Sequence, residues 1–147
     1  MEIHDPNLHL KLIEMCDCYL ETNYRDELQH LALSPGDDGD EAAMKYLALA
    51  IMYAVTEKAR KLSFKNKKGD ITAVIKADGE KIAVKAPSLD IFNRIITIMR
   101  TILHLEQDKG SLPLALGLRS GDLEVRVKVE RKENKESLKL TFSNSGD

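Results

Sequence analysis

The chain has 147 residues, of which 43% are hydrophobic and 31% are charged, and its formal net charge is −2. This composition is that of an ordinary globular protein with enough residues to bury a core, and it argues against disorder. We therefore expect a single α+β domain over residues 1–147. The near-neutral charge gives no overall attraction to nucleic acid or to anionic membranes.

The sequence also gives expectations about location. Its longest uncharged apolar stretch, Tyr46 to Val55, is shorter than the roughly 20 residues needed to cross a bilayer, so we expect no membrane segment. Residues 1–5 lack the basic and apolar regions of a secretory signal. Because Cys16 and Cys18 do not make a disulfide framework, we expect a cytoplasmic protein.

Two helices are expected in the N-terminal part of the chain. Asp5 and Pro6 are favourable at a helix start, and apolar residues then recur every three or four positions as far as Leu31. A Ser-Pro-Gly sequence at 34–36 should end this first helix. The second helix is expected from about Asp40 to about Leu62.

The second helix has a broad apolar surface, on which Tyr46, Leu49 and Tyr53 lie beside the main stripe. A helix that is apolar around more than half its circumference is either buried on two sides or meets a partner, and tyrosine is enriched at interfaces. We therefore predict a homodimer or another protein partner, bound through the helical layer at these three residues. A non-catalytic interaction or regulatory domain is the leading hypothesis.

A basic connector is expected after the second helix. Its basic residues are Lys58, Arg60, Lys61, Lys65, Lys67 and Lys68. Basic side chains around an aromatic residue, here Phe64, can bind phosphates and stack a base. The plainer interpretation is a cationic helix end that runs into a solvated turn. Binding of an anionic ligand or nucleic acid through Lys58–Lys68 is therefore an alternative hypothesis, which the net charge does not favour.

A hairpin is expected over residues 71–86, around the Asp78-Gly79 sequence that is typical of a type I′ turn. The predicted cross-strand pairs are Ile75 with Ile82, Ala73 with Val84, and Ile71 with Ala86. Pro87 should end the second strand, and Ser88 should cap a third helix with an apolar face wide enough to cover a sheet.

The last third of the chain, 112–143, predicts a three-stranded antiparallel meander, because apolar residues occupy every second position in three successive runs. Loops at Ser120-Gly121 and Asn134-Lys135 would pair Leu118 with Leu123 and Val129 with Leu140. One face is almost wholly apolar, so we expect a filled core there. The other face carries Glu124, Arg126, Lys128, Glu130, Lys139 and Thr141. Anything that docks on the sheet should dock on that second face.

The expected order of elements is α-α-β-β-α-β-β-β, with one antiparallel sheet made from the hairpin 71–86 and the meander 112–143 and with helices covering one face. We find no glycine-rich phosphate loop, nucleophile elbow or His-Glu-x-x-His motif, so we lean against an enzyme. A further alternative is a small-molecule-binding domain or enzyme with a pocket between the sheet and the third helix, carrying Arg94, Arg100 or His104.

Histidine and cysteine gather near the N-terminus, at His4, His9, Cys16, Cys18 and His30. Such a cluster raises the question of a metal site. Positions 16 and 18 of a helix are about 200° apart around its axis, so the two thiols diverge. We therefore expect no metal and no cofactor, and we expect Cys16 to pack as a small apolar residue.

Overall fold

The computed structural model describes residues 6–18, 23–33, 39–118 and 121–142. In chain order its elements are α1 (Pro6–Cys18), α2 (Tyr24–Leu33), α3 (Gly39–Thr56), β1 (Lys61–Lys67), β2 (Asp70–Ala77), β3 (Glu80–Val84), α4 (Leu89–Leu103), β4 (Lys109–Leu118), β5 (Gly121–Lys132) and β6 (Lys135–Phe142). The expected α+β class is confirmed. Within the described ranges, the chain has one helix and one strand more than the sequence predicted.

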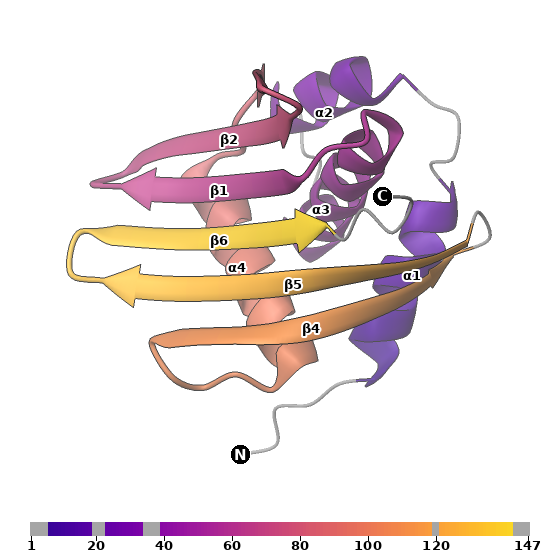
Figure 1. Ribbon diagram of the computed structural model, residues 1–147. Helices are drawn as coiled ribbons and strands as arrows, with labels where there is room; N and C mark the ends of the chain where they lie inside the picture. Colours follow the sequence, from indigo (N-terminus) through magenta and orange to yellow (C-terminus); the bar gives the residue numbers. More distant parts are fainter. Residues whose placement is uncertain (1–5, 19–22, 34–38, 119–120, 143–147) are drawn as a thin grey trace.

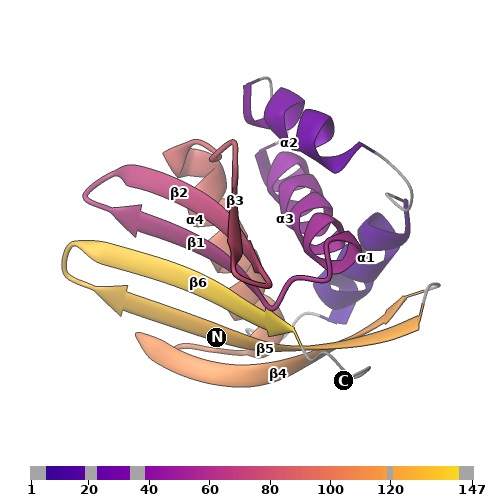
Figure 2. The ribbon, with the colours of Figure 1, turned by 45° about the horizontal axis from the view of Figure 1, so that its top comes forward.

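The elements form two layers (Figure 1). One layer is a six-stranded antiparallel sheet with the strand order β3-β2-β1-β6-β5-β4. The other layer is made of the helices, which lie on one face of the sheet, and the sheet curves around them (Figure 2). Helix α4 crosses this covered face and connects the two edge strands, β3 and β4. None of the helices in the described ranges is long and apolar enough to span a bilayer.

The predicted first helix is in fact two helices, α1 and α2. The side chain of Asn23 accepts a hydrogen bond from the backbone N–H of Asp26 (3.2 Å), and its carbonyl accepts one from Glu27 (3.0 Å). Asparagine is a favourable N-cap residue, so this position starts a new helix inside the continuous apolar pattern. The predicted start at Asp5 and the stop at 34–36 lie outside the described residues.

Helix α3 ends at Thr56, so the prediction that it continues to Leu62 is wrong. Lys58 adopts a left-handed backbone with a φ of 56°. The N–H of Lys58 donates to the carbonyl of Val55, and the N–H of Ala59 donates to that of Ala54. This is the hydrogen-bond pattern that closes a helix C-terminus, and the chain leaves it in a new direction.

The prediction of a basic connector over Lys58–Lys68 is also wrong, and this correction matters more. Most of the segment forms β1, a central strand of the sheet. Leu62 and Phe64 are fully buried, whereas Lys61, Ser63 and Lys65 keep part of their surface exposed. This alternation is the period of two that a strand with one covered face requires. β1 pairs with β2 on one side and with β6 on the other.

The predicted hairpin is confirmed in β2 and β3. Asp78 and Gly79 both have positive φ, 32° and 81°, as a type I′ turn requires. The observed pairs Ile75 with Ile82 and Ala73 with Val84 match the predicted register. The predicted pair of Ile71 with Ala86 does not form in the ladder, because β3 ends at Val84.

The meander 112–143 is confirmed, but both predicted registers are wrong by two residues. The observed pairs are Leu118 with Gly121, Leu116 with Leu123, and Val129 with Leu138. A displacement of two residues leaves each side chain on its predicted face, because side-chain direction alternates along a strand. Ser120, predicted in the first loop, lies outside the described residues.

An ion pair favours the observed register between β5 and β6. Arg131 lies opposite Glu136, and its Nε donates to Oε2 of that carboxylate over 3.3 Å. The predicted register would have put Arg131 opposite the apolar side chain of Leu138. Opposite charges at directly facing positions stabilise a sheet, so the observed pairing is the better one.

Helix α4 forms as predicted. The side chain of Ser88 accepts a hydrogen bond from the N–H of Ile91 (3.2 Å), and His104 closes the helix in a left-handed conformation. Phe92, Ile95 and Met99 are fully buried against the core. The helix therefore packs on the covered face of the sheet through the apolar residues that the sequence predicted for this contact.

The position of Phe64 gives a test of β1 as a central strand. We expect Phe64→Ala to lower the free energy of unfolding by about 3–5 kcal/mol, because it opens a cavity in a closed core. The exposed neighbour Lys67 on the same strand is the control, and Lys67→Ala should change stability by no more than about 0.5 kcal/mol. Urea denaturation of both variants measures the difference. Equal effects would mean that this segment is a solvated connector.

Candidate anion-binding face of the sheet

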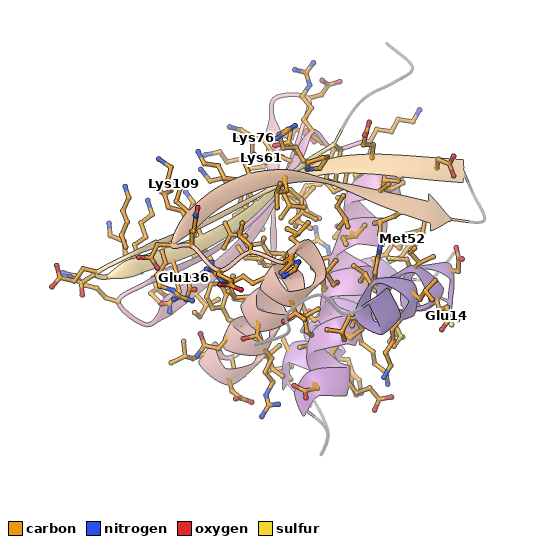
Figure 3. The ribbon with its side chains drawn as sticks, turned by 90° about the horizontal axis from the view of Figure 1, so that it is seen from below. Glu14, Met52, Lys61, Lys76, Lys109 and Glu136 are labelled. Atoms are coloured by element: carbon orange, nitrogen blue, oxygen red, sulfur yellow. The ribbon has the colours of Figure 1, made fainter. Side chains whose placement is uncertain are left out.

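The uncovered face of the sheet carries mostly basic side chains, and we call it the basic face. Side chains alternate between the two faces of a strand, so the neighbours of buried core residues point away from the helices. Lys61, Lys76 and Lys109 lie on this side in Figure 3. The basic residues of the face are Lys61, Lys65, Lys67, Lys76, Lys81, Lys109, Arg126, Lys128, Lys132, Lys135 and Lys139, and the acidic residues are Asp70, Asp122, Glu124 and Glu130.

Basic residues lie directly opposite one another on neighbouring strands of this face. The rows are Lys61–Lys76–Lys81, Lys128–Lys139 and Lys67–Lys135–Lys132. Neighbouring strands are about 4.8 Å apart. Like charges at directly facing positions destabilise a sheet, so each row costs stability in the free protein. An anion above the rows would remove that cost.

Described carboxylates do not neutralise the row Lys61–Lys76–Lys81 or the pair Lys128–Lys139, whereas Lys67 lies opposite Asp70. In the described part of the chain, Lys61, Lys76 and Lys139 form no ion pair with a carboxylate, whereas Lys132 lies 3.5 Å from Glu130. The pKa of Lys139 is lowered, first by partial burial and then by the positive charges of neighbouring lysines, Lys65 and Lys61 foremost. The crowded lysines therefore raise the energy of one another's charged forms.

The structure brings together only part of the predicted basic connector. Lys61, Lys65 and Lys67 point out from β1 onto the basic face. Lys58 closes α3, Lys68 lies in the turn after β1, and Arg60 lies 4.0 Å from Asp78 at the end of the sheet. These last three do not belong to the rows.

Sequence reasoning missed the residues that β2 and β3 add to this face, Lys76 and Lys81. The alternation of Lys61, Leu62, Ser63 and Phe64 was the available signal, because it has the strand period of two. Lys128 and Lys139 were predicted on the solvated face of the meander, where they do lie.

Base stacking by Phe64, part of the connector hypothesis, is contradicted. Phe64 is fully buried, and the other aromatic residues that the structure describes are also buried: Tyr24, Tyr46, Tyr53, Phe92 and Phe142. None of these rings reaches the basic face. Within the described residues, the face offers ammonium, guanidinium and hydroxyl groups rather than aromatic surfaces.

The predicted partner-interface residues Tyr46, Leu49 and Tyr53 are buried inside their own chain. The hydroxyl of Tyr46 donates to the carbonyl of Lys85, and burial raises its pKa. The ring of Tyr53 stacks on Tyr24 with 6.0 Å between ring centroids. Contacts of α3 with the other helices and with β1 account for its broad apolar surface. The apolar surface of α3 therefore gives no support for a partner interface, and the interface at these residues stays a prediction.

A cavity of 460 Å³ lies between α1, α3 and α4, and the described residues that line it all come from these helices. Met15, Met44 and Ile98 give it apolar walls, and Arg94 stands at its polar side. Arg94 is held there by two carboxylates, Asp40 at 2.7 Å and Asp90 at 3.0 Å. This cavity is therefore not the predicted pocket between the sheet and α4.

Two residues proposed for that pocket have other roles. Arg100 is buried, and its Nη2 donates to the carbonyl of Gln107. Burial, followed by the charge of Arg131, lowers the pKa of the Arg100 guanidinium. His104 closes α4 and does not line the cavity between the helices.

Of the N-terminal histidine and cysteine residues, His4 lies outside the described residues, and the described ones do not gather at one site. Cys16 is fully buried and its thiol pKa is raised to about 12, by burial and by Asp17, whereas Cys18 is exposed. His9 Nε2 donates to the carbonyl of Ala115 over 2.8 Å, which ties α1 to the edge strand β4. In the described residues, no three His, Cys, Asp or Glu side chains gather as a metal site would need.

Repulsion within the rows can be measured through Lys139. We expect Lys139→Gln to raise the free energy of unfolding by about 0.5 kcal/mol at low salt, because it removes a charge that faces Lys128. The gain should vanish at 1 M salt, where the screening length is about 3 Å. Urea denaturation at both salt concentrations tests this, with Lys11→Gln on α1 as control. A less stable Lys139→Gln protein at low salt would show that the rows do not repel.

Two comparisons with known proteins bear on this chain. No protein-family model matches it, and no curated protein matches it. The geometry of the basic face therefore carries the functional proposal.

Proposed function

We propose that this protein binds the phosphate backbone of nucleic acid across its basic face. The observation that carries the proposal is the pair of rows Lys61–Lys76–Lys81 and Lys128–Lys139, in which lysines face lysines on neighbouring strands and no described carboxylate faces them. Such rows cost stability in the free protein, and a chain of phosphates would offset the cost while releasing its own counterions.

The size of the basic face favours a polymer over a small anion. Basic residues occur on every strand of the sheet, from Lys81 on β3 to Lys109 on β4. With about 4.8 Å between strands, these two edges are about 24 Å apart. One small ligand would cover only a fraction of this distance, whereas a nucleic-acid backbone carries charges along all of it.

Binding on this face should depend little on base sequence. The groups on this face that can donate to a phosphate are lysine and arginine side chains, with the hydroxyls of Ser63, Thr72 and Thr141 between them. Contacts of this kind go to phosphate oxygens and set position, while sequence is read at base edges. Because the described aromatic rings are buried, base stacking adds nothing to the affinity.

A second proposal concerns the helical layer, which we infer binds a protein partner or a second copy of the chain. The observation that favours it is the 460 Å³ cavity between α1, α3 and α4, whose walls include Met15, Met44 and Ile98. Methionine adapts its shape to a partner surface. We infer a cytoplasmic location for the protein under either proposal, nucleic-acid binding or partner binding. The free thiols of Cys16 and Cys18 suit a reducing compartment.

The nucleic-acid proposal is tested by fluorescence anisotropy with a labelled duplex and a labelled single strand. We expect the wild-type protein to bind with an affinity that falls steeply as salt rises. Replacing Lys61, Lys76 and Lys139 together by Gln should reduce the slope of log K against log salt by about one for each phosphate that is no longer neutralised.

The matched control removes the same charge elsewhere. Lys11, Lys45 and Lys58 lie on the helical side, and their replacement by Gln should leave the salt slope unchanged. No binding by the wild-type protein at low salt, or an equal decrease of affinity in the two triple variants, would refute the basic face as the binding surface.

Self-association through the helical layer is tested by sedimentation velocity over a range of concentrations. We expect the sedimentation coefficient to rise with concentration, and Met15→Glu to abolish the rise because it puts a charge on the apolar wall of the cavity. Glu14→Gln, on the exposed side of the same helix, is the control. A monomer at every concentration would contradict self-association.

A further inference from the structure

A hollow of 230 Å³ interrupts the basic face where β1, β2, β3 and β6 lie side by side, and we call it the lysine pocket. Its rim includes Lys61, Lys65, Lys76 and Lys139. Ser63 and Val74 lie among these long side chains. The described residues that line it include no aspartate or glutamate.

The strand register explains why a hollow forms at this point. Ser63 is two positions from both Lys61 and Lys65 along β1, so all three point outward. Across the sheet, Ser63 lies opposite Lys139 on β6 and opposite Val74 on β2. Two short side chains at the centre and long ones around them leave a depression that the fold itself does not fill.

The chemistry of the lysine pocket suits a compact anion with several oxygens. Each rim ammonium brings three donors, and the hydroxyl of Ser63 can add another from the floor. The lowered pKa of Lys139, which follows burial and then the charges of Lys65 and Lys61, shows that these cations are crowded. A tetrahedral dianion would receive donors on several sides, whereas a carboxylate has two oxygens in one plane.

We propose that the lysine pocket binds one phosphate group and anchors the ligand of the basic face there. The inference rests on the proposed function, which takes this phosphate from the backbone of a nucleic acid. It adds that the lysine pocket is where that backbone is held most tightly. The same chemistry would accept the phosphate of a small phosphorylated molecule, so the experiments must separate these two sources.

Phosphate binding is measured by NMR titration of the ¹⁵N-labelled full chain with inorganic phosphate at constant ionic strength. We expect saturable chemical-shift changes at the amides of Ser63, Val74 and Lys139. The amide of Ala115 on β4 should show no saturable change. Sodium acetate, as a carboxylate control, should give no saturable shift. Shifts that are non-saturating and equal over the whole face would show that only general ionic effects act there, and would overturn the pocket.

Variants with equal charge distinguish the pocket from the rest of the face. Lys61→Gln with Lys139→Gln removes two rim cations, and Lys109→Gln with Lys132→Gln removes two cations outside the pocket. The pocket pair should weaken phosphate binding by about tenfold or more, as expected when charge-assisted hydrogen bonds are removed. The outer pair should leave it unchanged. Well-dispersed amide spectra confirm that both proteins are folded.

The same two variants separate failure of the pocket from failure of the proposed function. If the wild-type protein binds oligonucleotide and both pairs weaken that binding equally, the pocket inference is overturned while the basic face stands. If the pocket binds inorganic phosphate but the wild-type protein binds no oligonucleotide, the proposed function fails. The pocket then serves a small phosphorylated molecule, and phosphoserine should compete with inorganic phosphate for it.

Discussion

The antiparallel ladder between β1 and β6 is the interaction on which the rest of the structure depends. These strands are far apart in sequence, and their pairing joins β1–β3 and β4–β6 into one sheet. On the covered side, the ladder puts Leu62 opposite Leu140 and Phe64 opposite Leu138, all fully buried. Without this pairing, each half would expose an unpaired strand edge and the helices would have no continuous surface to cover.

The same ladder creates the basic face, because a strand cannot bury alternate residues without exposing those between them. Burial of Phe64 fixes the outward direction of Ser63 and Lys65, and β6 then brings Lys139 to the side of Ser63. The apolar core thus supplies the energy that holds the lysines in register against their repulsion. This also reconciles the basic face with a net charge of −2. Composition averages over the molecule, whereas the fold gathers more basic than acidic residues on this one face.

Local signals in the sequence predicted local structure well, and non-local pairings were out of their reach. The Asp78-Gly79 turn and the Ser88 cap depend on a few neighbouring residues, and both form as predicted. The meander faces were predicted because alternation is local, but its registers were not, since a shift of two residues preserves every face. β1 was missed because the apolar helix before it obscured its start and its partner β6 is distant in sequence.

Lysines on a sheet have a second common role, which is to stop edge strands from pairing with other molecules. That role fits Lys81 on β3 and Lys109 on β4, because these are the edge strands. It does not fit Lys61 or Lys139, because β1 and β6 are central and both of their edges are already paired. Repulsive lysines at the centre of a sheet protect no edge, and they lower stability in the free protein. The anion that we propose to bind there would make their placement favourable, and its binding would in turn stabilise the fold.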